Sequence, residues 1–289
     1  MRLNGRRESD NVDDRRGKGG AKAGLAGIGG IIAIVVITLL SGGDLSTVFQ
    51  NLSQSGALSG GQTTEQNYQP TAEEEELAKF SKQILASTED IWTEEFKKMG
   101  KTYQAPKMVL FTNAVESGCG NATSSTGPFY CSADQTVYID LSFFSSMRQQ
   151  LGADGDFAYA YVIAHEVGHH VEYLLGTLDK VHQAMSRTNE TESNKLSVRL
   201  ELLADFYAGV WAHHDNAMFG SLEQGDIEEA IQCAQVIGDD YLQKKARGYA
   251  VPESFNHGTS AQRMKWFVLG LKTGDVSQGQ TFNKSDAEL

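Results

Sequence analysis

Basic residues are scarce in this sequence: Lys and Arg number 25 against 37 Asp and Glu, which gives a net charge of −12. An acidic surface repels phosphate backbones, so we expect no nucleic-acid partner. The deficit is uneven along the chain. Residues 1–22 hold seven of the basic residues and only four of the acidic ones, which leaves 18 basic against 33 acidic in the remainder. Such a basic start is better explained by a membrane.

Long uncharged runs are also rare, and the one from Leu25 to Leu40 reads LAGIGGIIAIVVITLL. With its flanks, residues 23–43, it reaches the ~20 residues that a helix needs to cross a bilayer. By the positive-inside rule, residues 1–22 are then a cytoplasmic tail and the rest of the chain lies outside the membrane. A cleaved signal peptide is the alternative, although no Ala-x-Ala cleavage site follows the run.

No internal repeat is visible in the sequence. Residues 44–70 are rich in Ser, Gln, Gly and Thr and are typical of a flexible tether, so residues 71–289 are expected to form the folded domain. The apolar spacing predicts one long helix, two strands and then a series of helices: 71–99, strands 106–112 and 136–141, and helices 143–151, 156–175, 194–214, 227–237 and 260–271. A small sheet followed by many helices indicates an α+β fold. The strand 136–141 is a candidate edge on which a peptide could lie extended.

Cysteine is limited to three residues: Cys119, Cys131 and Cys233. A domain outside the cytoplasm permits disulfides, and a Gly- and Ser-rich loop joins Cys119 to Cys131, so we expect these two to pair. A zinc knuckle built on them is the alternative, but it would need two further ligands and none is evident nearby. Cys233 is then the unpaired one, and we expect it to be buried in a helix.

The segment that carries chemistry is His165-Glu166-Val167-Gly168-His169, an H-E-x-x-H within the predicted helix 156–175. Residues four apart share one face of a helix, so His165 and His169 can both bind one zinc ion. Glu166 lies beside the first ligand and can take a proton from water activated by that ion. The site is therefore predicted to hydrolyse peptide bonds. A pair of satisfied core histidines and a purely structural zinc site are the alternatives.

A catalytic zinc site needs a third protein ligand. The longer metzincin pattern fails, because Glu172 and Leu175 occupy the positions where it requires Gly and His. Glu201 lies instead in an apolar stretch of a later helix and is predicted as the third ligand. Asp205, one helical turn further on, is predicted to hydrogen-bond the far nitrogen of a ligand histidine and so to fix its ring.

Two further residues could stabilise the oxyanion formed during attack on a carbonyl. His257 lies just before the last predicted helix, and Arg263 lies within it. The alternative for the His257 segment is an ordinary helix start, with Thr259 or Ser260 as the cap.

These residues resemble a bacterial family of neutral zinc metallopeptidases. The resemblance covers about residues 71–283 and rests on CGNATSSTGPFYC, DQTVYIDLSFF, AHEVGHHV, ELLADFYAGVWAHH and HGTSAQRMKWF. It implies a zincin-like domain similar in layout to the gluzincins, with His165, His169 and Glu201 as zinc ligands and Glu166 as base. The chain departs from the family at Phe206 and Gly279, where the resemblance implies cysteines. A lost disulfide explains both departures if the two positions are adjacent.

Three functions compete on this sequence. The first is an active, membrane-anchored zinc peptidase that acts on a peptide or protein. The second is a metal-bearing binding or scaffolding protein that keeps the fold without turnover. The third is a structural zinc site, which predicts unfolding when the metal is removed.

Overall fold

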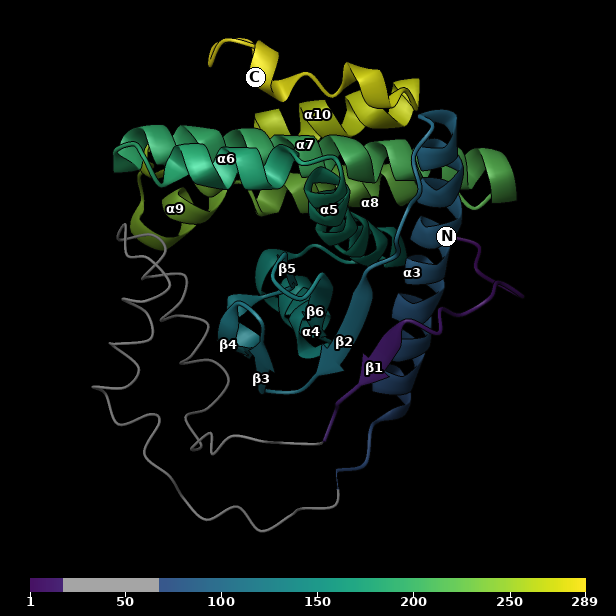
Figure 1. Cartoon of the computed structure of the whole chain (residues 1–289). Helices are drawn as coiled ribbons and strands as arrows, with labels where there is room; N and C mark the ends of the chain where they lie inside the picture. The colour runs from purple at the N-terminus through teal and green to yellow at the C-terminus, as the bar shows by residue number, and fades with distance from the viewer. Residues whose placement is uncertain (18–67) are drawn as a thin grey trace.

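The computed structural model describes residues 1–17 and 68–289. The strands are β1 Val12–Asp14, β2 Lys107–Phe111, β3 Ala114–Ser117, β4 Gly120–Thr123, β5 Phe129–Cys131 and β6 Thr136–Asp140. The helices are α3 Ala72–Lys98, α4 Ser142–Ser146, α5 Asp156–Leu174, α6 Thr177–Met185, α7 Glu190–Phe219, α8 Asp226–Val236, α9 Asp239–Arg247 and α10 Ser260–Thr273. Figure 1 shows the strands gathered below a layer of helices, with α3 running along one side of both. The predicted α+β class is confirmed.

The four-stranded sheet has the order β1-β2-β6-β5, with β1, β2 and β6 parallel and β5 antiparallel to β6. β3 and β4 form a separate antiparallel hairpin. The predicted strands at 106–112 and 136–141 are present as β2 and β6. The expectation that 136–141 forms an edge is wrong, because β6 is buried along its whole length and pairs on both sides. The edge of the sheet on that side is β5.

Helix α3 begins and ends where the sequence indicates. Thr71 caps it in a reciprocal capping box with Glu74, acidic residues occupy its first turn, and Lys97 and Lys98 occupy its last. Its buried face includes Ile84, Trp92 and Phe96 and packs on the helical core. Capping and apolar spacing act together here, so the prediction of a helix over 71–99 is confirmed.

The helical layer is held by close packing of α7 against α5 and α10. Gly209 of α7 and Gly270 of α10 meet at one crossing, where a Cβ on Gly209 would lie 2.1 Å from the carbonyl oxygen of Phe267. The two helices therefore touch backbone to backbone. α7 is longer than predicted at both ends, because Asn189 caps its start and Gly220 its end. Helices α6 and α9 were not predicted.

Residues 1–17 are part of this fold. β1 extends the sheet beside β2, and the Arg6 guanidinium lies 2.7 Å from the buried Asp215 carboxylate of α7. The prediction that the fold starts at residue 71 and that residues 1–22 form a separate tail is therefore wrong for residues 1–17. The predicted anchor 23–43 and most of the tether 44–70 lie outside the described residues. Among the described helices, none combines the length and apolar character that a bilayer crossing requires.

The predicted disulfide between Cys119 and Cys131 is present. It closes the loop that carries β4 and leads into β5. Cys233 is buried in α8. A Cβ on Gly279 would lie 2.9 Å from Phe206 Cδ1. The two positions where the family resemblance implies cysteines are thus adjacent, and the Phe206 ring fills the space against the C-terminal segment.

Candidate metal centre

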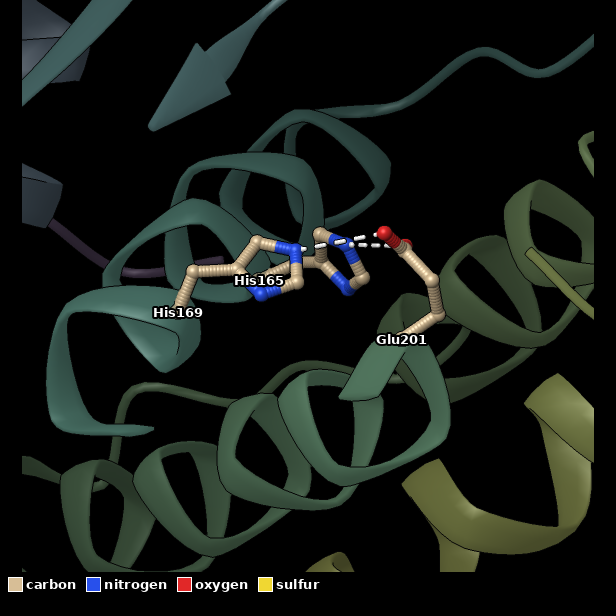
Figure 2. Close-up of side chains that lie close together, drawn as sticks. All are labelled: His165, His169 and Glu201. Carbon is tan, nitrogen blue, oxygen red and sulfur yellow. Dashed lines mark ion pairs between the residues drawn. The ribbon is translucent and has the colours of Figure 1, made fainter. Parts of the chain in front are cut away.

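Helices α5 and α7 bring two imidazoles and a carboxylate to one point. His165 and His169 lie one turn apart on α5, and Glu201 faces them from α7 (Figure 2). Glu201 Oε2 lies 3.2 Å from His165 Nε2, and Glu201 Oε1 lies 3.6 Å from His169 Nε2. These three are the residues that the sequence analysis proposed as zinc ligands.

Each ligand histidine is held from behind by a carboxylate. His165 Nδ1 donates to Asp205 Oδ1 over 2.8 Å, and His169 Nδ1 donates to Glu172 Oε2 over 2.9 Å. An ionised carboxylate only accepts, so each proton stays on Nδ1 and each Nε2 lone pair is left for a metal. Asp205 occupies the position that the sequence predicted for it. Glu172 was missed, although its i, i+3 spacing from His169 was a signal that could have found it.

The donor set fits zinc. Two neutral imidazoles and one carboxylate are the ligands of one class of catalytic zinc site. A tetrahedral ion with bonds of about 2.0–2.1 Å separates its ligands by about 3.3 Å, close to the two separations between Glu201 and the histidines. In the part of the chain that the structure describes, the candidate ligand atoms of these three residues all lie within 4.8 Å of one another.

The charges at this centre support one another. Burial alone would lower the pKa of His165, but Asp205 and Glu201 outweigh it and raise that pKa to about 10. Burial alone would raise the pKa of Glu201, but His257, His169 and His165 hold it well below its usual range. Both shifts favour positive charge at the point where the three side chains meet. This is the behaviour expected of a site built to hold positive charge.

Arg263 of α10 is held on Asp205, beside His165, and it also lines the cavity. Its Nε and Nη2 donate to the two oxygens of Asp205 over 2.9 and 3.0 Å, and all of these groups are buried. Tyr161 also donates to Asp205, over 2.5 Å. Burial would raise the pKa of Asp205, but Arg263 and His165 lower it to about 2. The structure thus places Arg263 on Asp205, where it keeps the carboxylate ionised behind His165.

His257 lies on the wall of the cavity that the metal centre faces. Its Nδ1 is 3.3 Å from Asp239 Oδ1, and Asp239 Oδ2 accepts the backbone N–H groups of residues 256, 257 and 258. Burial would lower the pKa of His257, but Glu201 and Asp239 raise it to about 8. Thr259 caps α10, as the alternative reading expected. A helix cap and a role for His257 at the cavity are compatible, because the cap lies two residues after His257.

Glu166 shares this cavity with the ligands. The cavity has a volume of about 470 Å³, and Glu166, His165, His169 and Glu201 all line it. His170, the next residue after the second ligand, points elsewhere: its Nε2 donates to the Gln104 carbonyl and its Nδ1 accepts from the Tyr130 hydroxyl. His165, Glu166 and His169 of the H-E-x-x-H therefore face the cavity, whereas the side chain of His170 points into the protein interior.

Gly168 sets the distance between the two ligand-bearing helices. A Cβ at this position would lie 2.9 Å from the carbonyl oxygen and 3.0 Å from the Cα of Ala204 on α7. Real Cβ atoms do not approach so closely, so only glycine lets α7 come near enough for Glu201 to reach both histidines. The sequence analysis assigned this variable position of the motif no role.

We expect Gly168→Ala to move α7 away from α5, to weaken zinc binding and to lower the free energy of unfolding by about 1–3 kcal/mol. An alanine with room would do the opposite, since Gly→Ala in a helix interior stabilises by roughly 0.5–1 kcal/mol. Urea unfolding and zinc titration of the two proteins measure both effects. A variant as stable as the wild type, with unchanged zinc affinity, would show that the helices do not need this contact.

Comparison with known proteins identifies the class. The sequence profile of the family described as "Putative neutral zinc metallopeptidase" matches residues 1–282. The chain is 50% identical to the uncharacterized protein YpfJ of Escherichia coli K12 over 293 residues, which cover 99% of this chain and 100% of that protein. It is 40% identical to the uncharacterized protein Rv2575 of Mycobacterium tuberculosis H37Rv over 210 residues, 69% of each chain. The chain belongs to this zinc metallopeptidase family. No solved structure matches it, so the zincin-like layout stays a prediction.

Proposed function

We propose that this protein is a zinc-dependent endopeptidase that cleaves peptide bonds with a metal-activated water. One observation carries the proposal: His165, His169 and Glu201 converge on the wall of a cavity that Glu166 also lines. A structural zinc site is closed by four protein ligands, whereas a catalytic one keeps a position open toward its substrate. Among the described residues, three ligands gather here and the centre faces a cavity.

Different side chains of the site are proposed to carry different parts of peptide hydrolysis. Zinc, when bound by His165, His169 and Glu201, would supply a Lewis acid that lowers the pKa of water and polarises the peptide carbonyl. The Glu166 carboxylate accepts a proton from the attacking water and delivers it to the departing amine. Asp205 and Glu172 keep the ligand imidazoles in one tautomer and orientation.

His257 is proposed to stabilise the oxyanion that forms on the substrate. Its Nδ1 lies 3.3 Å from the Asp239 carboxylate, which favours the charged form of the ring, and the charged ring carries an Nε2–H that can donate into the cavity. The Asp239 carboxylate also holds three backbone N–H groups around His257, which fixes the ring before substrate binds. A pre-set donor costs no reorganisation during the reaction.

The cavity favours peptides with large apolar side chains. Away from the metal centre its wall is mainly apolar: Phe129, Phe143, Met147, Leu151, Val162, Ile237 and Leu242. Apolar walls with a few convergent polar groups are typical of sites that bind a ligand by burial and orient it by hydrogen bonds. β5, at the sheet edge, borders the same cavity through Phe129 and Tyr130 and could pair with an extended substrate.

We expect the protein to cleave a mixed peptide library next to large apolar residues. This activity should be lost after dialysis against a chelator and restored when zinc is added. Mass spectrometry of the products reads both the activity and the sequence preference. A library that stays intact in the presence of zinc would favour the second function, a metal-bearing binding protein without turnover. Unfolding on chelation would favour a structural zinc site.

We also propose that the domain works outside the cytoplasm. The disulfide between Cys119 and Cys131 supports this location, because such bonds persist in oxidising compartments. Attachment to the membrane through residues 23–43 is proposed from the sequence alone, without the single crossing that would place residues 1–17 and 68–289 on opposite sides.

A further inference from the structure

The N-terminal segment, residues 1–17, is joined to the body by a β-ladder. Val12, Asp13 and Asp14 of β1 pair with residues 108–110 of β2. Met108 N–H donates to the Asn11 carbonyl, and Arg15 N–H donates to the Leu110 carbonyl, each over 2.8 Å. Without β1, these groups of β2 would lose their partners at the edge of the central sheet.

Buried carboxylates of the body also take their ion-pair and hydrogen-bond partners from this segment. The Asp215 side chain on α7 is only 1% exposed, and the Arg6 guanidinium lies 2.7 Å from it. Glu89 of α3 is likewise buried and accepts from Ser9 Oγ over 2.5 Å and from Asn11 Nδ2 over 2.8 Å. Removing the partner of a buried charge is strongly destabilising. The body is thus built to hold this segment.

The basic character of the segment has a structural cause. All five of its arginines lie in ion pairs with carboxylates: Arg2 with Glu223, Arg6 with Asp215, Arg7 with Glu89 and Asp90, Arg15 with Asp13, and Arg16 with Asp14 and Glu75. Three of the arginines, Arg2, Arg6 and Arg7, pair with residues of the body more than 70 positions away. The positive-inside rule infers the orientation of a membrane span from lysines and arginines that stay in the cytoplasm beside it. Because these arginines form ion pairs within the folded protein, their positive charge is no evidence for the side of a membrane on which they lie.

We infer that residues 1–17 and residues 68–289 lie in the same compartment. A hydrogen bond of 2.8 Å cannot span a hydrocarbon core about 30 Å thick. An odd number of membrane crossings between residues 17 and 68 would put β1 and β2 on opposite sides. The topology predicted from the sequence, with a cytoplasmic N-terminus and an external catalytic domain, is incompatible with this ladder.

Thiol labelling of the full-length chain in intact cells tests the inference. Asp10→Cys and Gln224→Cys each place one thiol at an exposed position, in the N-terminal segment and in the body respectively. The native cysteines are either disulfide-bonded or buried, so background labelling is low. A membrane-impermeant maleimide should label both variants or neither in intact cells, and both after permeabilisation. Labelling of only one variant in intact cells would overturn the inference.

A stability measurement on the full-length chain asks whether the segment is docked on the body. Arg6→Ala should lower the melting temperature of the full-length chain by roughly 5–15 °C, because it leaves Asp215 buried and unpaired. Arg15→Ala is the matched control, since its pair with Asp13 is about half exposed on both sides. Equal melting temperatures for the two variants would show that the segment is not docked. Neither readout depends on peptidase activity, so failure here leaves the proposed function untouched.

Discussion

Glu166→Gln is expected to lower kcat/KM for peptide hydrolysis by about 10²- to 10⁴-fold, the range that a general base contributes. The amide has the size of the carboxylate but cannot accept the proton of the attacking water. Zinc content should stay at the wild-type level, because the three ligands come from other side chains and the carboxylates behind the imidazoles are intact. Steady-state kinetics and metal analysis of the purified proteins measure the two quantities.

Glu228→Gln is the matched control for this variant, because it makes the same chemical change on an exposed position of α8. It should retain full activity. Loss of zinc from Glu166→Gln would mean that this residue supports the metal, and undiminished activity would mean that another group accepts the proton. Either result would remove Glu166 from the role proposed for it.

Asp205→Ala is expected to lower the free energy of unfolding by about 3–5 kcal/mol, because it leaves the Arg263 guanidinium buried without its partner. Two other donors lose the same acceptor, namely His165 Nδ1 and the Tyr161 hydroxyl. The His165 ring is then free to take the wrong tautomer, so zinc affinity should fall by roughly 10–100-fold as well. Urea unfolding and competition with a zinc chelator measure these effects separately.

The double variant Asp205→Ala with Arg263→Ala is the control that isolates the ion pair. If the unpaired charge dominates, the double variant should be less destabilised than the sum of the two single changes. Additive losses would indicate that packing, rather than charge, holds this part of the core. Stability unchanged in Asp205→Ala would contradict the network altogether.

The sequence was most informative where chemistry and local spacing coincide. His165, Glu166 and His169 follow a spacing that is typical of a shared metal, and Thr71 with Glu74 is a capping signal that acts within one turn. Glu201 was found because a carboxylate in an apolar stretch needs a cation. In each case the local pattern and the tertiary role agree, so a reading of the sequence could find both.

The residues that were missed act through tertiary contacts that leave no local pattern. Gly168 matters because of a backbone on another helix, and Asp239 matters because α9 places it under residues 256–258. β1 has only three residues, and the strand with which it pairs lies almost 100 positions away in the sequence. The arginines near the start were read as a membrane signal for the same reason: their partners are distant in the sequence and invisible to a count of charges.

The disulfide between Cys119 and Cys131 treats the two parts of the cavity differently. Residues 124–130 lie inside that loop and form one wall of the substrate cavity, whereas every residue of the metal centre lies outside it. The covalent bond removes conformational freedom from the wall and leaves the zinc ligands unconstrained. In the location that we propose, outside the cytoplasm, the disulfide would form after export, so this wall of the cavity would become fixed later than the metal centre.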